Sequence, residues 1–230
     1  MRKIVNFLIS KIKHESYQID EHLRLAVLFH ESLNRILQIV WGVIRFRTHA
    51  KFPSFISTRI QVRDMANIHL GKGVTLEKDV VLDGASVNGL VIGDNVKVGR
   101  YTQIRCSGTL KQLGKGFVIG ENSGIGEFSF FGAAGGIEIG SNVIMGQNVR
   151  MHAENHNYSD DKIPIRSQGV THSGIVVKDN CWLGAGVVVL DGVTIGSGCV
   201  IGANALVTKD IPDNSVAVGS PAKVIKSRLE

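Results

Sequence analysis

The sequence is poor in cysteine, proline and aromatic residues and has no long hydrophobic run. Its 230 residues include three cysteines, four prolines and 6% aromatic residues. Cys106, Cys181 and Cys199 have neither metal-site spacing nor the even number of a disulfide framework, so we expect buried thiols in a reducing, cytoplasmic compartment. The longest uncharged apolar stretch of the N-terminal region, Ile36 to Ile44, is far shorter than the roughly 20 residues that cross a bilayer. No apolar segment with a cleavage site follows Met1, so we expect no secretory signal.

Positive charge and glycine are unevenly distributed along the chain. Residues 1–64 contain 11 Lys and Arg against 5 Asp and Glu, whereas residues 65–230 contain 15 of each kind, so the net charge of +6 belongs to the first region. Gly42 is the only glycine before position 71, and the other 26 follow it. The first region lacks the interleaved basic and aromatic residues of nucleic-acid-binding modules, so we expect no nucleic-acid partner.

From position 70 onward an apolar residue recurs at every sixth position. A period of six matches neither a helix nor a single strand, but it fits short strands joined by tight turns. Three such strands form one 18-residue turn, and the 18 repeat positions predict a parallel β-helix of about six turns. An ordinary β-sandwich would not keep this phase over 30 residues. The repeat positions are Leu70, Leu76, Leu82, Ile92, Val98, Ile104, Ile119, Ile125, Phe131, Ile139, Met145, Met151, Val177, Leu183, Val189, Ile195, Ile201 and Val207.

Four interruptions break the repeat, and each adds residues after a run of three. The longest covers residues 152–176. A long insertion in a compact solenoid is extruded from a corner and is usually functional. We therefore expect the chemistry in this loop.

The C-terminal half contains five characteristic segments in a fixed order: Trp-Leu-Gly-Ala-Gly (182–186), Gly-Val-Thr-Ile-Gly (192–196), Val-Ile-Gly-Ala (200–203), Val-Thr-Lys-Asp-Ile-Pro (207–212) and Gly-Ser-Pro-Ala-Lys (219–223). On these segments the chain resembles the hexapeptide-repeat acyltransferases, and in particular the polysaccharide and the maltose and galactoside O-acetyltransferases. The resemblance is dense over residues 139–226, looser over 68–138 and absent over 1–62. It implies a left-handed β-helix, an acetyl-CoA donor and a homotrimer. We accordingly divide the chain into a helical segment (1–62), a β-helix (63–213) and a C-terminal tail (214–230).

The loop contains candidate catalytic and acceptor-binding residues. Acyl transfer to an alcohol needs a base of near-neutral pKa, and imidazole is suited to that role. By the resemblance, His156 stands at the position of the family's catalytic histidine, and its neighbours Asn155 and Tyr158 look like those of the polysaccharide acetyltransferases. His152, next to a repeat position, is the competing candidate. Glu127 lies beside the position where the sugar acetyltransferases have an acceptor-binding asparagine.

A metal site is the minority interpretation of the same loop. His152, His156 and His172 offer three imidazoles, and the γ-class carbonic anhydrases bind zinc through three histidines on this fold. Because His156 and His172 lie inside the insertion rather than on regular turns, we expect no metal. Glu154 is interpreted as a solvated loop charge.

The resemblance also assigns residues to the acyl donor. In the family the pantetheine arm of coenzyme A runs along the outside of the last turns, and basic residues near the C-terminus meet its phosphates. Trp182 is interpreted as a wall of this groove or a trimer contact. The matching residues are Trp182, Ala185, Ala203, Thr208, Lys209, Lys223 and Lys226.

Residues 1–50 are predicted to form helices with a basic, amphipathic character. Apolar residues recur at steps of three or four in the second helix, which Pro53 ends. We expect this apolar face to cap the open end of the β-helix or to pack in the trimer, and contact of the basic residues with the inner face of a membrane is an additional hypothesis. The apolar positions are Ala26, Phe29, Leu33, Ile36, Leu37, Val40 and Ile44.

Together these features predict an acetyl-CoA-dependent O-acetyltransferase that modifies a carbohydrate hydroxyl in the synthesis of a surface polysaccharide, capsule or lipopolysaccharide. Three alternatives stay open at this point. One is acetylation of a small acceptor, such as a streptogramin-type antibiotic or a free sugar. The others are a γ-carbonic-anhydrase-like zinc protein and a scaffold without catalytic activity.

Overall fold

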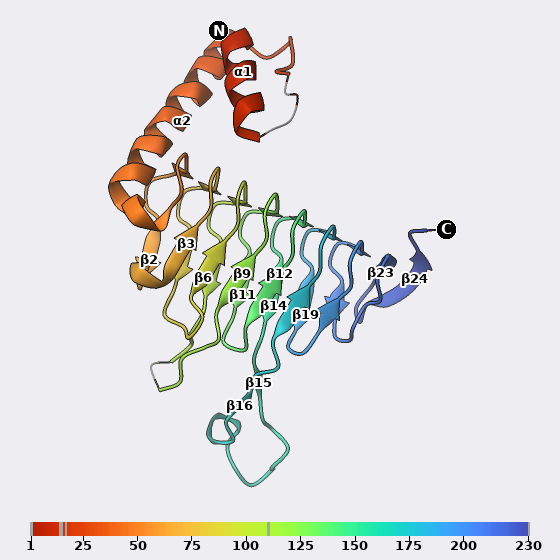
Figure 1. Ribbon diagram of the computed structural model, residues 1–230. Helices are drawn as coiled ribbons and strands as arrows, with labels where there is room; N and C mark the ends of the chain where they lie inside the picture. Colours follow the sequence, from red (N-terminus) through yellow and green to blue (C-terminus); the bar gives the residue numbers. More distant parts are fainter. Residues whose placement is uncertain (1, 14–15, 17, 110, 230) are drawn as a thin grey trace.

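A computed structural model describes residues 2–13, 16, 18–109 and 111–229. Three parallel sheets form the sides of a triangular prism, and successive turns of the chain stack along its axis (Figure 1). The predicted parallel β-helix is thereby confirmed.

Each sheet takes one strand from nearly every turn. The nine-stranded sheet contains β1 (Phe55–Ile56), β4 (Thr75–Leu76), β7 (Lys97–Val98), β10 (Gly124–Ile125), β13 (Ile144–Met145), β18 (Trp182–Leu183), β21 (Val200–Ile201), β23 (Ser215–Val218) and the antiparallel β24 (Lys223–Ser227). The seven-stranded sheet contains β2 (Gln61–Arg63), β5 (Val81–Asp83), β8 (Gln103–Arg105), β11 (Phe130–Gly132), β14 (Arg150–His152), β19 (Val188–Leu190) and β22 (Leu206–Val207). The six-stranded sheet contains β3 (Ile68–Leu70), β6 (Leu90–Ile92), β9 (Phe117–Ile119), β12 (Ile137–Ile139), β17 (Ile175–Val177) and β20 (Thr194–Ile195).

All 18 repeat positions are buried, and they form the core in three vertical stacks. In the nine-stranded sheet, for example, Leu76 pairs with Val98, which pairs with Ile125, and the register continues through Met145 to Leu183. Each inward side chain therefore packs on its counterparts in the turns before and after. This stacking removes an apolar side chain from water at every sixth residue and explains the period.

The β-helix begins earlier than the boundary at residue 63. Strand β1 starts at Phe55, so the seven-stranded sheet gives seven turns among the described residues rather than about six. Ile56 pairs with Leu76, and Val62 pairs with Leu82, in the same register as the repeat. Ile56 and Val62 are six residues apart and so continue the repeat toward the N-terminus, but the interval from Val62 to Leu70 is eight residues and hides this in the sequence.

All of the insertions leave the prism at one corner. We call the corner between the nine- and seven-stranded sheets the first edge, and the corner between the seven- and six-stranded sheets the second edge. The insertions follow β5, β8, β11 and β14, so they all lie at the second edge. The longest contains an antiparallel hairpin of β15 (Asn155–His156) and β16 (Val170–Thr171), with a 3₁₀ turn at Ile165–Ser167 between them, and projects from the prism (Figure 1).

Of the two N-terminal helices, α2 contacts the start of the prism, whereas α1 lies beside the beginning of α2 (Figure 1). Helix α1 spans Arg2–Lys13, α2 spans Leu25–Phe46, and short 3₁₀ turns occupy Arg47–His49 and Met65–Asn67. Phe46 is fully buried in the core cluster, and a Cβ on Gly42 would lie 2.8 Å from the Ser54 hydroxyl oxygen, so α2 contacts the first turn closely. No helix among the described residues is long and apolar enough to cross a membrane.

Candidate active site

The hairpin places His156 on an exposed strand at the second edge. His156 lies opposite Val170, and the strand pairing continues through the Asn157 amide, which donates to the Gly169 carbonyl oxygen at 3.0 Å. The Asn157 side chain donates to the Gln168 carbonyl oxygen at 3.1 Å. Both the backbone and a side chain therefore hold the hairpin next to His156. The predicted neighbours Asn155 and Tyr158 are exposed, and Tyr158 makes no ring contact among the described residues.

The base of the hairpin is closed by a contact that the sequence did not predict. His172 Nε2 lies 2.8 Å from Glu154 Oε2, and the His172 side chain is only 17% exposed. Just beyond it, the backbone amides of Ser173 and Gly174 donate to the Asp191 carboxylate of the next turn at 3.0 and 2.7 Å. Glu154 is therefore not a solvated charge, and the two ends of the insertion are tied to each other and to the prism.

His152 has a different environment from His156. It ends β14, and its ring packs against Phe130 with a centroid separation of 5.6 Å. Burial, with a smaller contribution from the positive charge of Arg150, lowers the pKa of His152 below its usual value. Burial thus favours the neutral form of the His152 imidazole, which packs against Phe130 at the foot of the hairpin.

The three loop histidines do not assemble a metal centre. Among the described residues, no group of three or more His, Cys, Asp or Glu side chains converges on a common point. The Nε2 atom of His172, the third candidate ligand, instead lies 2.8 Å from Glu154 Oε2. The described residues of a single chain therefore do not bring three zinc ligands together.

Glu127 lies on the first edge, not beside His156. It occupies the corner between β10 and β11, where its carboxylate is 3.1 Å from the Arg100 guanidinium. Successive first-edge corners are joined by backbone bonds: Phe128 N donates to Arg100 O, Asn148 N to Glu127 O, and Gly186 N to Gln147 O, each at 2.8–2.9 Å. We call the corner residues Lys78, Arg100, Glu127, Gln147, Ala185 and Ala203 the first-edge row. One chain thus holds Glu127 and His156 at two different corners.

Two of the predicted donor residues belong to the same row. Ala185 and Ala203 are exposed, and neither backbone N–H donates a hydrogen bond within the described residues. The Ala185 carbonyl oxygen is already paired, since Asn204 N donates to it at 2.8 Å. Two adjacent corners therefore present free N–H donors, which suit the carbonyl oxygens of a pantetheine arm or a developing oxyanion.

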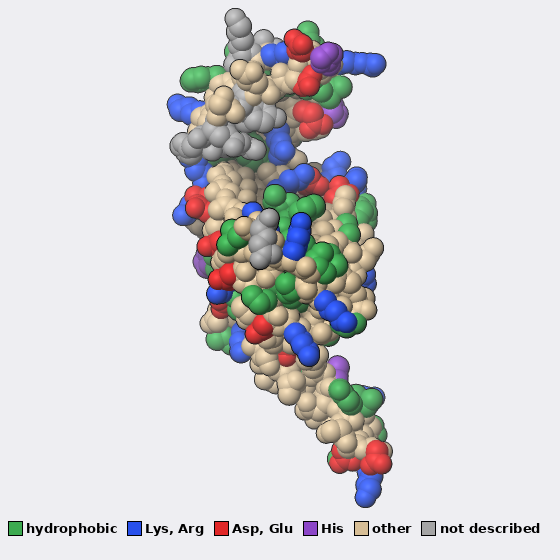
Figure 2. All heavy atoms as spheres, turned by 90° about the vertical axis from the view of Figure 1, so that its right-hand side faces the viewer, with side chains coloured by type: hydrophobic (Ala, Val, Ile, Leu, Met, Phe, Trp, Pro, Cys, Tyr) green, Lys and Arg blue, Asp and Glu red, His purple; other side chains and the backbone are tan. Residues whose placement is uncertain are grey.

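The remaining donor candidates are spread over other surfaces. Trp182 on β18 is 54% exposed in the nine-stranded sheet, and Thr208 and Lys209 follow β22 at the second edge. Lys223 and Lys226 lie on β24, at the C-terminal end of the prism. Figure 2 looks onto this end and shows basic side chains scattered among apolar ones rather than gathered in one patch. One chain therefore does not collect all seven candidates around a single cavity.

The repeat that builds the prism matches a known family of transferases. Residues 174–209 match the family model described as bacterial transferase hexapeptide (six repeats). The chain is 31% identical over 197 residues to WbbJ of Escherichia coli, a protein named as a lipopolysaccharide biosynthesis O-acetyl transferase, covering 83% of this chain and 87% of that one. The chain therefore belongs to the hexapeptide-repeat acetyltransferases, whose left-handed β-helix it shares.

Solved structures agree with this assignment. A maltose O-acetyltransferase from Clostridium difficile is 35% identical and superposes with a TM-score of 0.51, covering 62% of this chain and 69% of that one. AntD, an N-acyltransferase from Bacillus cereus solved with dTDP and 3-hydroxybutyryl-CoA, shares the fold at 18% identity and a TM-score of 0.52, covering 76% and 79% of the two chains. Three other curated relatives are matched over only 42 to 58% of their own length.

Proposed function

We propose that this acetyltransferase uses acetyl-CoA to acetylate a carbohydrate hydroxyl during the synthesis of a surface polysaccharide or lipopolysaccharide. The observation that carries the proposal is the likeness to WbbJ, which extends over most of both chains rather than over the repeats alone. Coenzyme A as the donor is supported by the acyl-CoA bound to AntD and by the free N–H donors of Ala185 and Ala203. No metal has a role in the proposed reaction.

His156 is the proposed general base. Its imidazole takes the proton of the acceptor hydroxyl while the hydroxyl oxygen attacks the thioester carbonyl. The carbonyl becomes a tetrahedral oxyanion, which accepts a hydrogen bond from a backbone N–H such as that of Ala185. When the C–S bond breaks, the thiolate of coenzyme A leaves and takes up the proton from the imidazolium. Both substrates are bound together, and no acyl-cysteine forms, in keeping with the burial of all three cysteines.

The proposed site is completed between copies of the chain. Because His156 extends from the second edge while Glu127 and Ala185 lie on the first, the hairpin of one copy must reach the first edge of another. A homotrimer, which the family resemblance implies, would repeat this contact three times. Lys209, Lys223 and Lys226 then have the proposed role of contacting the phosphates of coenzyme A as point charges.

The test is release of free coenzyme A in the presence of carbohydrate acceptors. With a suitable acceptor, wild-type protein should release thiol, and His156→Ala should lower kcat by a factor of about 10² to 10⁴. His156→Asn is the matched variant, since it keeps a polar side chain of similar size but cannot act as a base. Equal turnover by wild type and both variants would refute the assignment of the base.

A free sugar is the second candidate acceptor. The likeness to a maltose O-acetyltransferase favours it, although that likeness covers only 62% of this chain. Maltose, methyl β-galactoside and a longer glycan should be compared at equal concentrations. Higher kcat/KM for the longer glycan supports the polysaccharide role, and higher kcat/KM for maltose or the galactoside supports the free sugar.

A further inference from the structure

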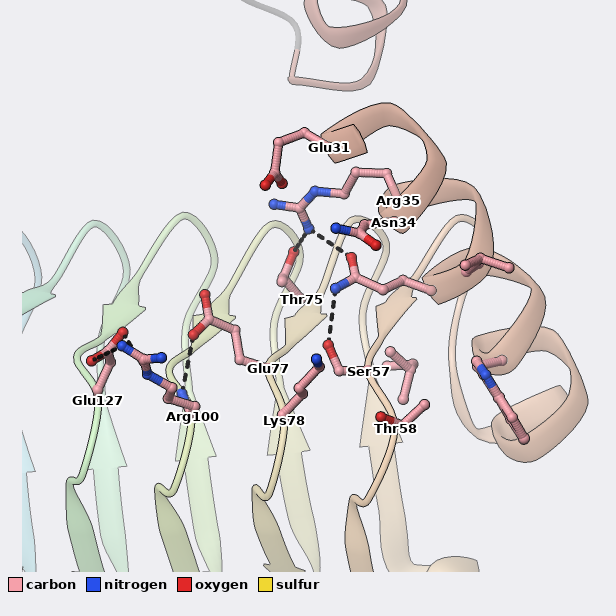
Figure 3. Close-up of a pocket in the computed structure, with 14 residues that line it drawn as sticks. Glu31, Asn34, Arg35, Ser57, Thr58, Thr75, Glu77, Lys78, Arg100 and Glu127 are labelled. Carbon is pink, nitrogen blue, oxygen red and sulfur yellow. Dashed lines mark hydrogen bonds and ion pairs between the residues drawn. The ribbon is translucent and has the colours of Figure 1, made fainter. Parts of the chain in front are cut away.

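A groove lies between α2 and the first turns of the β-helix. Its volume is about 590 Å³, within the range of small-molecule sites. Figure 3 shows Asn34 and Arg35 extending from α2 above the turns that carry Ser57, Thr75 and Glu77. We call this cavity the α2 groove. Neither the loop histidines nor the predicted donor residues line it, but Glu127, the predicted acceptor-binding residue, does.

Hydrogen-bonding side chains connect the two walls of the groove. Arg35 Nη1 donates to Gln38 Oε1 at 3.1 Å and to Thr75 Oγ1 at 3.4 Å, and Gln38 Nε2 donates to Ser57 Oγ at 2.9 Å. The Arg35 guanidinium also lies over the Phe55 ring, 5.1 Å from its centroid, which fixes its plane. Ser57 and Thr75 are buried beneath these contacts. The result is a preformed set of donors and acceptors on both sides of the cavity.

The charges in the groove are balanced, which indicates the class of ligand. Glu77 accepts from Lys97 at 2.8 Å and from the Arg100 backbone amide at 3.1 Å, and Glu127 is paired with Arg100. A nucleotide or the phosphates of coenzyme A would require a surplus of positive charge, whereas a polyhydroxylated ligand needs mixed donors and acceptors. Trp41 adds an apolar surface on which a sugar ring can pack. The charged lining residues are Arg35, Lys78 and Arg100 with Glu31, Glu77 and Glu127.

The groove also leads toward the predicted donor residues. It runs from Ser57 in the first turn to Glu127 in the fourth. At a strand spacing of about 4.8 Å this length is about 14 Å, so the groove is longer than one sugar ring. Glu127 belongs to the first-edge row, and Ala185 stands two turns further along it, about 10 Å away by the same spacing. A chain of sugars in the groove would thus point one end at the donor.

We propose that the α2 groove binds two or more sugar units of the carbohydrate acceptor, with the reacting unit at the Glu127 end. This inference rests on the proposed function and deepens it, because it makes the acceptor an oligosaccharide and assigns its recognition to the helix outside the repeat. The units that do not react are held by Arg35, Gln38 and Trp41 from α2 and by Lys78 from the β-helix.

The experiment uses two neutral ladders as probes: glucose to maltotetraose, and galactose to β-1,4-galactotriose. Wild-type kcat/KM should rise about tenfold or more between the monosaccharide and the trisaccharide of the accepted ladder. Trp41→Ala and Lys78→Ala should each raise the acceptor KM about three- to tenfold for the trisaccharide only, at unchanged kcat. Lys178→Ala, an exposed lysine far along the chain whose Nζ is 3.9 Å from Asp213, is the matched control.

Binding is measured separately from catalysis, by saturation-transfer NMR on His156→Ala protein with the same ladders. Binding that strengthens with the length of the sugar chain and is lost in Trp41→Ala supports the α2 groove as the acceptor site. If such binding is found but wild type transfers no acetyl group, only the proposed function fails. Acetyl transfer with equal kcat/KM for one and three sugar units overturns the groove and leaves the proposed function standing. Absence of binding to every probe, or binding unaffected by both groove variants, also overturns it.

Discussion

His172 Nε2 lies 2.8 Å from Glu154 Oε2, and this contact closes the hairpin that carries His156. In the register that pairs Asn155 with Thr171, Glu154 and His172 are the next opposing residues. The pair lies where the insertion leaves the prism, so it fixes the direction in which the exposed strand extends.

Loss of this pair should impair positioning of the proposed base without removing the base. We expect His172→Ala to lower kcat about three- to tenfold, far less than His156→Ala, because one hydrogen bond to a charged group is lost. His172→Gln keeps a donor for Glu154 and should retain most of the activity. Thiol-release kinetics check this order, and an His172→Ala effect as large as that of His156→Ala would contradict it.

The pH dependence of activity can separate His152 from His156. Arg150→Ala removes a positive charge that, after burial, helps to lower the pKa of His152, so the pKa of His152 should rise. If His152 were the base, the acidic limb of kcat/KM would move to higher pH. Because we assign the base to His156, we expect that limb to stay in place. The comparison requires only pH–rate profiles of wild type and Arg150→Ala.

The buried thiols should be unreactive in the folded protein. Burial raises the pKa of Cys106 to about 12 and that of Cys181 to about 11, so thiolate is scarce at pH 8. We expect little alkylation by iodoacetamide at pH 8 without denaturant, and full alkylation after unfolding. The pKa values of these thiols are higher in the folded protein than the value of about 9 in the unfolded chain. Their contribution to the free energy of unfolding is therefore fully present below about pH 9 and declines as the pH rises above it. Rapid alkylation with loss of activity would contradict the mechanism without acyl-cysteine.

Phe46 should be essential to the cap on the first turn. Its side chain is fully buried in the core cluster at the end of α2, so Phe46→Ala should lower the free energy of unfolding by about 3–5 kcal/mol. Leu25→Ala, at an exposed position of the same helix, should change it little. Urea unfolding of the two variants measures the difference, and equal stability would mean that α2 does not cap the prism.

The exposed side of α2 should be a contact between copies of the chain. Phe29, Leu33, Ile36, Val40 and Val43 are all exposed and follow one another at steps of four and three, the spacing of a helix–helix seam. We expect Ile36→Asp to lower the mass measured by light scattering, whereas Asn34→Asp, on another side of the helix, should not. Unchanged mass with loss of binding to anionic vesicles would instead assign this face to a membrane.

The repeat was predictable because burial imposes it residue by residue. Each of the 18 positions is buried in the interior of the prism, so the chain carries a six-residue period that can be read directly. The corner at Asn142 has a φ of 58°, a left-handed conformation that asparagine adopts readily, so this turn too has a local cause. His156 could be singled out only through its neighbours and the family resemblance.

The other features depend on contacts that have no local period. Glu154 and His172 are 18 residues apart and meet only because the insertion folds back as a hairpin. The α2 groove combines side chains of a helix with those of four successive turns, and no spacing in the sequence relates Arg35 to Thr75. The separation of Glu127 from His156 likewise follows from the corner at which each lies.

The first-edge row has a consequence for how acceptor length can evolve. Because each turn adds one corner residue and the same axial step, the distance from Glu127 to Ala185 is a whole number of turns. In the proposed arrangement of acceptor and donor, the row would therefore set the acceptor length in steps of about 4.8 Å. Gain or loss of a single 18-residue turn between these residues would change that length by one step while leaving both ends of the site intact.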